Sequence, residues 1–394
     1  MTIDILKEVQ NIQEYMIKVR RYFHMHPELS EMEYNTQTFI IDELDIMGIE
    51  YEKIADTGVM GIIRGKNEKK VIGLRSDMDA LPMEEANEVI YKSIVSGVMH
   101  ACGHDAHMSI LLGTAKILKS YQEFLDGTIK LFFQPAEESV GGANRMINQG
   151  CMIKPNVNYT IGLHVMPYMN YDMVELKKGC LNASTDEVKI IFNGKASHGA
   201  YPDQGSDSIV ISSEFISSIQ GILSRKISPL NSAVLTFGTI IGGTKPNIVA
   251  SKVEINGTLR TIDGSTRQYL KDKIKQMAID ISKHHDGTAD VIITASYPAV
   301  FNDDITIELI EKGIKNYLPN IGIQYKLSPS MGGEDFSYFS LKSRAAYYSI
   351  GCKISDKDNY PLHSIDFDID ERCLMTGAST YLSSILTLLK EGEF

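Results

Sequence analysis

The sequence lacks the features of membrane, secreted and nucleic-acid-binding proteins. Its apolar runs are interrupted well before the roughly 18 residues of a membrane-spanning helix. Residues 1–8 carry acidic side chains early and have neither the basic start nor the apolar core of a secretory signal. Lys and Arg number 39 against 50 Asp and Glu, with no basic run containing interleaved aromatic residues. We therefore expect a cytoplasmic protein with neither membrane nor nucleic-acid partners.

Cysteine is also scarce. The five cysteines are an odd number and lack the short, regular spacing of a disulfide framework (Cys102, Cys151, Cys180, Cys352 and Cys373). Each is expected to be a free thiol or a metal ligand. Hydrophobic residues at 43% and charged residues at 23% are ordinary for a folded protein, and 394 residues are too many for one typical domain.

The first part of the chain has an α/β pattern. Between Val59 and about Gly179, β-rich apolar runs at 71–74, 128–133 and 159–163 alternate with helical periodicity, as at 108–121. Parallel strands joined by helical crossovers produce this alternation. The pattern predicts a central, mostly parallel sheet.

A different order follows from Thr185 to about Ser296. Strand-like runs and helical patterns succeed one another as β-α-β-β-α-β, which predicts a ferredoxin-like α+β domain with two helices on one face of a small sheet. After Tyr297 the α/β pattern resumes. We therefore expect a discontinuous catalytic domain (1–184 and 297–394) with an inserted lid or dimerisation domain (185–296). An exposed edge strand of the small sheet would favour a homodimer or homotetramer.

Polar residues with metal-binding capacity follow three of the predicted strands. Asp77 and Asp79 follow the first, Glu137 and Glu138 the second, and His164 the third. Open α/β sheets bind ligands at the carboxyl ends of their strands. The Cys102-Gly103-His104 segment adds a thiol and an imidazole immediately before a predicted helix.

Each of these signals has an ordinary structural explanation when taken alone. Cysteine often acts as a small buried hydrophobe, and a glutamate pair can lie in a solvated loop. However, two like charges at a half-buried strand end are costly unless cations neutralise them. Their joint occurrence at three strand ends favours a metal site.

Five segments together resemble the aminoacylase and carboxypeptidase metallopeptidases. The similarity is greatest to the branch of hippurate hydrolase, indole-acetyl amino acid hydrolases and N-acetyldiaminopimelate deacetylase. It runs in order from about Arg20 to the end of the chain. The matching segments are residues 73–82, 100–107, 134–138, 162–164 and 332–336.

The resemblance implies a site with two divalent metals. Its implied ligands are Cys102, His104, Glu138, His164 and His363, and Glu137 would be the general base. Two adjacent cations would activate a water and polarise the scissile carbonyl. Asp79 is expected to orient a ligand, with a purely structural role as the alternative.

Relatives outside this branch often carry His-x-Asp where this chain has Asp77-Met78-Asp79. The usual metal histidine is therefore absent, and Cys102 and His104 complete the ligand set. A thiolate suits zinc, whereas harder ions such as manganese accept the other ligands; cobalt and nickel are also possible.

The inserted domain contributes further candidates. In similar proteins a histidine at the position of His198 stabilises the oxyanion, and Asn247 and Arg260 match carboxylate-binding positions. Gly332 is expected to let the backbone approach the substrate. The alternatives are a surface histidine, a salt-bridged arginine and a plain turn. His24, His26 and His107 are expected to support the structure or orient ligands rather than bind metal.

These features predict a hydrolase that deacylates N-acyl-L-amino acids with metal-activated water. A dipeptidase or carboxypeptidase on the same two-metal site is the first alternative. An amidase with Cys102 as nucleophile is the second. A non-enzymatic metal- or peptide-binding protein is the third, although such a protein would have no need for Glu137.

Overall fold

Two units make up the part of the chain that the computed structural model describes, residues 3–355 and 358–393. Unit 1 contains the chain up to Leu181, Phe301–Ser328 and the chain from Asp335 onward. Unit 2 contains Asn182–Val300 and Pro329–Glu334. The short Pro329–Glu334 segment thus packs with unit 2, although it lies in the predicted catalytic stretch.

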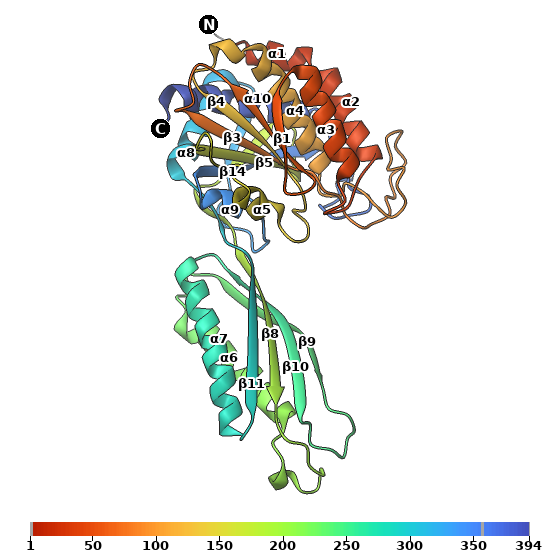
Figure 1. Cartoon of the computed structure of the whole chain (residues 1–394), viewed down its shortest axis with the longest axis vertical. Helices are drawn as coiled ribbons and strands as arrows, with labels where there is room; N and C mark the ends of the chain where they lie inside the picture. Colours follow the sequence, from red (N-terminus) through yellow and green to blue (C-terminus); the bar gives the residue numbers. More distant parts are fainter. Residues whose placement is uncertain (1–2, 356–357, 394) are drawn as a thin grey trace. The chain divides into compact units, whose positions relative to one another are not determined.

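Unit 1 is built on an eight-stranded sheet with strand order β1-β2-β4-β3-β5-β14-β6-β13 (Figure 1). The pairs β3–β4, β3–β5, β5–β14 and β6–β13 are parallel, and the other three pairs are antiparallel. Its central strands are almost wholly buried, as expected for a sheet covered on both faces. The strands are β1 (Glu50–Ile54), β2 (Gly58–Arg64), β3 (Val71–Asp77), β4 (Thr128–Gln134), β5 (Tyr159–Asn170), β6 (Met173–Leu176), β13 (Gly322–Tyr325) and β14 (Arg344–Lys353).

Helices cover the two faces of this sheet. Leu131 and Phe133 of β4 join the core that includes α4, whereas Phe132 between them stacks on Phe339 of α9, with ring centroids 5.3 Å apart. Alternate side chains of a strand point to opposite faces, so α4 and α9 lie on opposite sides. The helices are α1 (Ile5–Asn11), α2 (Gln13–Met25), α3 (Tyr34–Met47), α4 (His104–Ser120), α5 (Gly142–Asn148), α8 (Asp304–Tyr317), α9 (Ser337–Ser340) and α10 (Cys373–Glu391).

Unit 2 has the predicted β-α-β-β-α-β order. Its antiparallel sheet has the order β11-β8-β10-β9, and α6 and α7 pack on one face over a core that includes Ile190, Phe215 and Ile274. Each helix begins after an aspartate that accepts a backbone N–H: Asp207 before α6 and Asp263 before α7. The elements are β8 (Ser184–Asn193), α6 (Ser208–Lys226), β9 (Ala233–Gly242), β10 (Lys252–Thr261), α7 (Gly264–His284) and β11 (Thr288–Tyr297). Short strands β7 (Gly179–Asn182) and β12 (Val300–Asn302) form a separate pair.

The predicted fold class is confirmed, with local corrections. The strand predicted to end at Leu163 continues to Asn170, because β14 pairs beside it as far as Lys353. Near the amino terminus, Ile12 separates the helices α1 and α2. The β-rich pattern that starts at Val59 begins with β2, which is antiparallel to β4.

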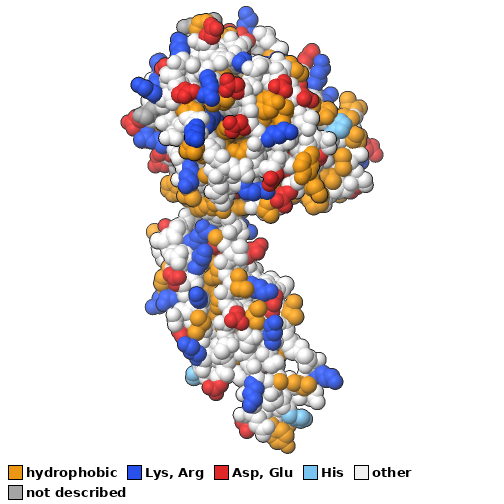
Figure 2. Space-filling model, in the orientation of Figure 1, with side chains coloured by type: hydrophobic (Ala, Val, Ile, Leu, Met, Phe, Trp, Pro, Cys, Tyr) orange, Lys and Arg blue, Asp and Glu red, His pale blue; other side chains and the backbone are white. Residues whose placement is uncertain are grey.

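The surface of each unit carries mixed charge. On the face drawn in Figure 2, acidic and basic side chains are interspersed with apolar ones. Within the described residues, none of the helices has an apolar stretch long enough to cross a bilayer.

Candidate metal centre

Two overlapping groups of ligand atoms lie at the carboxyl end of the unit 1 sheet. The first comprises Cys102, His104 and His164, and the second comprises Cys102, Glu138 and His363; within each group the ligand atoms lie within 4.8 Å of one another. Cys102 is common to both groups. The two groups suit two neighbouring metal ions, and Cys102 could contribute to holding either of them.

Local structure brings each candidate ligand to this position. Cys102 and His104 flank Gly103, the left-handed residue before α4, while Glu138 follows β4 and His164 lies inside β5. His363 comes from the returning part of the chain, and its backbone N–H donates to the Ala101 carbonyl at 2.9 Å. That hydrogen bond fixes the backbone of His363, the last candidate ligand, beside the Cys102 segment.

Contacts of the Nδ1 atom with backbone carbonyl oxygens orient two of the imidazoles. His164 Nδ1 donates to the Val165 carbonyl at 2.8 Å, which leaves Nε2 facing Cys102 Sγ at 3.4 Å. His104 Nδ1 lies 2.8 Å from the Asp79 carbonyl oxygen. Ligating histidines are commonly held by their second ring nitrogen in this way. Burial lowers the pKa of His164 well below its usual value, so its imidazole is neutral and able to ligate.

Several buried polar atoms at this position fit bound cations. Among the described residues, His104 Nε2, Asp79 Oδ1 and Glu138 Oε1 are buried without a hydrogen-bond partner. Burial opposes a positive charge on His104, yet the Asp77 and Asp79 carboxylates outweigh it and raise its pKa to about 10. The centre therefore favours positive charge, and its sulfur, nitrogen and oxygen donors suit two metal ions.

Asp79 joins three parts of the centre. Its Oδ2 accepts hydrogen bonds from the Ser30 hydroxyl at 2.6 Å and from the Glu138 backbone N–H at 2.9 Å. Its Oδ1 lies 3.4 Å from His104 Nδ1. A carboxylate in this position can hold a ligand and the glutamate loop at once, although a ligand-orienting role stays a prediction.

Asp77 is held by a buried network. Arg75 Nη1 donates to Asp77 Oδ2 at 2.6 Å, and His107 Nδ1 lies 2.6 Å from Asp77 Oδ1. His107 Nε2 accepts the Val165 N–H at 3.0 Å, so both ring nitrogens are used within the protein. The predictions omitted Arg75 and its further partners Gln134 and Asp335. A charged side chain inside a buried strand is the signal that would have indicated such partners.

The loop that carries Glu137 is fixed by an unexpected residue. Ala136 has a left-handed backbone (φ 54°), and its N–H donates to the buried Glu33 carboxylate at 2.8 Å. The other Glu33 oxygen accepts the Thr57 hydroxyl at 2.6 Å. Left-handed alanine is strained, so the surrounding structure must hold it. No sequence motif pointed to Glu33.

Glu137 lies among the ligands. One of its carboxylate oxygens is within 4.8 Å of ligand atoms of His104 and Glu138. It is thus close enough to exchange a proton with a molecule at the metal centre, as a general base requires.

The surroundings of Cys102 disfavour a nucleophilic thiolate. Burial, followed by the charges of Glu138, Glu137 and Asp77, raises the pKa of the Cys102 thiol well above its ordinary value. Reactive cysteines need the opposite shift. These surroundings therefore favour a neutral Cys102 thiol that loses its proton only when a metal cation binds. They disfavour a free thiolate that could act as a nucleophile.

The first turn of α4 is anchored by a second buried network. Arg20 Nε donates to Asp105 Oδ2 at 2.8 Å, and His24 Nδ1 lies 2.8 Å from the same oxygen. Arg20 also pairs with Asp368 at 3.0 Å. His24 thus contacts Asp105, the residue that follows His104. A structural role is the prediction for His24, and this contact supports the start of α4.

The candidate residues of unit 2 form two separate groups. His198 is exposed, and the neighbouring Gly199 N–H donates to the Asn247 carbonyl at 2.9 Å. Arg260 lies beside the backbone of Gly333, next to the exposed Gly332. Asn247 lies before Lys252, the first residue of β10, and Arg260 is eight residues after Lys252, a span of about 26 Å at the usual rise per strand residue. One chain therefore does not bring Asn247 and Arg260 to the same small substrate.

Known proteins are similar to this chain over nearly its full length. It is 38% identical over 378 residues to thermostable carboxypeptidase 2 of Saccharolobus solfataricus, covering 94% of each chain. It is 34% identical to hippurate hydrolase of Campylobacter jejuni over 98% of this chain and 100% of that one. It is 36% identical to N-acetyl-L-cysteine deacetylase of Bacillus subtilis over 98% and 93%.

A solved structure has a similar fold. Bacillus subtilis YXEP, described as a dinuclear metal-binding peptidase of the M20 family, superposes with a TM-score of 0.84 at 29% identity, covering 98% of this chain and 100% of that chain. The model of the protein family described as Peptidase family M20/M25/M40 matches residues 73–387 of this chain. The fold and centre define a metal-dependent hydrolase of the α/β class. The chain belongs to Peptidase family M20/M25/M40.

Proposed function

We propose that this hydrolase deacylates N-acyl-L-amino acids. The observation that carries the proposal is Glu137, which lies beside the ligand Glu138 at a centre suited to two metals. The relatives named as a hippurate hydrolase and an N-acetyl-L-cysteine deacetylase support the same substrate class.

Each residue of the centre has a defined part in this reaction. Cys102, His104, Glu138, His164 and His363 would hold two divalent cations. When bound, such cations lower the pKa of water and polarise a carbonyl. Glu137 takes the proton of the attacking water and passes it to the departing amine. Asp79 holds the Glu138 backbone N–H with its carboxylate and His104 Nδ1 with its backbone carbonyl oxygen during these steps.

Zinc or manganese is the proposed metal, with cobalt and nickel as further possibilities. The Cys102 thiolate favours zinc, and the Glu138 carboxylate accepts harder ions. Reconstitution of stripped protein with each ion, followed by deacylation assays, tests this choice.

Substitution of Glu137 tests the mechanism. Glu137→Gln should lower kcat for N-acetyl amino acids by about 10²–10⁴-fold, the usual contribution of a general base, with two metals still bound. Glu123→Gln, at an exposed glutamate of the same unit, is the matched control. Full activity of Glu137→Gln, or of metal-stripped protein, would contradict the proposal.

A carboxypeptidase or dipeptidase activity is the second candidate. The similarity to the thermostable carboxypeptidase favours it. A panel of N-acetyl amino acids, hippurate and dipeptides separates the two candidates, because the preferred class should have the higher kcat/KM.

Two copies of the chain could together supply the unit 2 residues. We propose that His198 stabilises the oxyanion, that Asn247 and Arg260 contact the substrate, and that Gly332 lines its path. Because Asn247 and Arg260 lie at opposite ends of β10, a homodimer or homotetramer would have to combine groups from different copies. The exposed edge strand β9 offers a pairing surface. Mixing inactive Glu137→Gln and His198→Ala chains should restore activity if His198 acts across the dimer.

The cytoplasmic location also stays a prediction. None of the five cysteines forms a disulfide bond, which fits a reducing compartment.

A further inference from the structure

One buried carboxylate holds both ends of the segment that carries Glu137. Asp335 accepts hydrogen bonds from Gln134 Nε2, at 2.8 Å to Oδ1 and 2.7 Å to Oδ2, and from the Ala143 backbone N–H, at 3.0 Å to Oδ2. Gln134 ends β4 and Ala143 lies in the first turn of α5, so these two partners come directly before and after the segment 135–142. Asp335 thus holds the start and the end of this segment together.

The same carboxylate is joined to the imidazoles of the metal centre through Arg75. Arg75 Nη2 donates to Asp335 Oδ1 at 3.0 Å, and Arg75 Nη1 donates to Asp77 Oδ2 at 2.6 Å. Asp77 Oδ1 lies 2.6 Å from His107 Nδ1, and His107 Nε2 accepts a backbone N–H of β5 at 3.0 Å. The segment with the proposed base and the strand with a proposed ligand therefore share one network of hydrogen bonds.

Stability alone does not account for this network. Arg75, Asp77 and Asp335 each expose at most 1% of their surface. Buried ion pairs contribute little net stability, because the loss of hydration offsets the attraction between the charges. A rigid support has a clear use in catalysis, since a misplacement of about 1 Å caused by a distant change can lower a rate about 100-fold.

The support lies close to the proposed base itself. One carboxylate oxygen of Asp335 is within 4.8 Å of one of Glu137. The next residue, Glu138, has a separate anchor, because its backbone N–H donates to Asp79 at 2.9 Å. A change at Asp335 should therefore displace Glu137 while Glu138 keeps its own support.

We propose that Asp335 is the positioning residue of the general base. By holding Gln134 and Ala143, it keeps the Glu137 carboxylate where this group can exchange a proton with the attacking water. The inference rests on the proposed deacylase function, and it adds a residue that sets the rate through the loop without touching the substrate.

Asp335→Asn tests the proposal, because it keeps the shape of the side chain and removes one acceptor. Arg75, Gln134 and Ala143 all donate to Asp335, and an amide can satisfy these donors with only one of its two polar atoms. With metal in saturating excess, the kcat for N-acetylglycine should fall about 10–100-fold, and KM should change by less than about twofold. Hydrogen exchange at 135–143 should accelerate even in metal-free protein.

A second substitution should restore the contact with reversed polarity. Gln134→Glu alone places another carboxylate against Asp335, and this repulsion should also lower kcat. When both substitutions are combined, the amide introduced at 335 can donate to the carboxylate introduced at 134. That carboxylate can also accept Arg75 Nε, as Gln134 Oε1 does at 2.8 Å. The double variant should therefore recover most of the lost kcat.

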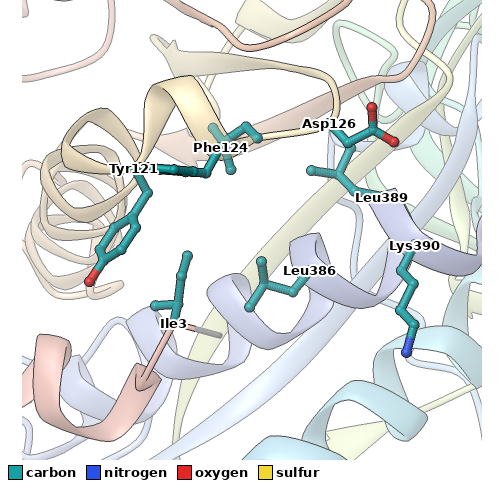
Figure 3. A pocket seen from close by; sticks show the side chains of 8 residues that line it. Ile3, Tyr121, Phe124, Asp126, Leu386, Leu389 and Lys390 are labelled. Atoms are coloured by element: carbon teal, nitrogen blue, oxygen red, sulfur yellow. The ribbon is translucent and has the colours of Figure 1, made fainter. Parts of the chain in front are cut away.

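Two control variants leave the proposed support intact. Leu389 is buried and lines an apolar pocket with Phe124 and Asp126, which lie shortly before β4 (Figure 3). Leu389→Ala should lower the melting temperature without lowering kcat, because it removes packing at the end of β4 opposite Gln134. Asp303→Asn is the control for the change of side chain, since Asp303 also accepts a backbone N–H in the first turn of a helix.

The following outcomes would overturn the proposal: full kcat in Asp335→Asn, an equal loss of kcat in Leu389→Ala, a raised KM at unchanged kcat, or a double variant no more active than Asp335→Asn. If Asp335→Asn does not fold, Gln134→Met decides, because it removes one partner of Asp335 and leaves the carboxylate in place. Full kcat in folded Gln134→Met would then contradict the proposal. A wild type inactive towards N-acetyl amino acids, or a fully active Glu137→Gln, would instead refute the deacylase function itself.

Discussion

Gly103 is the position at which one methyl group should disturb the metal centre most. It has φ +87° directly between the proposed ligands Cys102 and His104, and an added Cβ would lie 2.3 Å from Val165 Cγ2. A left-handed L-residue costs roughly 1–2 kcal/mol, and overpacking a core adds roughly 1–3 kcal/mol. Gly103→Ala should therefore destabilise unit 1 by about 2–5 kcal/mol.

The metal affinity should fall as well. Val165 follows His164 and donates its N–H to His107, so a displaced Val165 moves two imidazoles of the centre. Disturbing such supports typically costs about 10–100-fold in metal affinity. Competition with a chromogenic chelator measures the dissociation constants, and thermal denaturation measures the stability.

Gly97→Ala is the matched control for backbone strain. Gly97 also has a left-handed backbone (φ +72°), but nothing lies within 4 Å of its added Cβ. It should show the strain of about 1–2 kcal/mol without loss of metal affinity. Adding Val165→Ala to Gly103→Ala should recover part of the affinity. If Gly103→Ala melts like Gly97→Ala and binds metal like wild type, the close packing argued for Gly103 is wrong.

Three further changes have defined outcomes. Cys102→Asp should shift the metal preference from zinc towards manganese, measured as the ratio of reconstituted activities; an unchanged ratio would show that the sulfur does not set the preference. Glu33→Ala should lower kcat about tenfold with both metals retained, because the strained Ala136 loses its acceptor; Glu33→Gln should restore most of the activity, and equal losses in both variants would argue against this. Burial lowers the pKa of Lys130 from 10.5 to about 8. Between these two pH values the unfolded chain binds more protons than the folded chain. The folding stability of the wild type should therefore rise relative to that of Lys130→Met as the pH increases from about 8 to 10.5. Parallel melting curves for these two proteins across that interval would contradict the shift.

Local sequence patterns predicted the elements that position the centre. The apolar run at 128–133 indicated β4, and the costly Glu137–Glu138 pair directly after it indicated a cation site. The βαββαβ order of unit 2 could also be predicted from the sequence, because each helix and strand has its own hydrophobic period. The five proposed ligands were predicted from the resemblance of motifs to a known family. The structure brings these residues close together, and their individual roles stay predictions.

Contacts between distant parts of the chain were beyond the sequence patterns. Arg75 binds Asp335, and Glu33 binds the Ala136 N–H, across separations that no local period encodes. The inclusion of His164 within β5, rather than after it, depends on pairing with β14. Such features require the folded arrangement, because each depends on a partner that periodicity does not identify.

The central position of β14 has a consequence for the synthesis of the chain. β5 pairs with β3 on one side and with β14 on the other, but β14 is made only after all of Asn182–Val300 has left the ribosome. Until then β5 carries an unpaired edge and the centre lacks His363, while unit 2 can already fold as a separate body. Full assembly of the proposed metal centre is therefore a late event in biosynthesis, and a nascent chain stalled before His363 would hold four of the five proposed ligands beside an open strand edge.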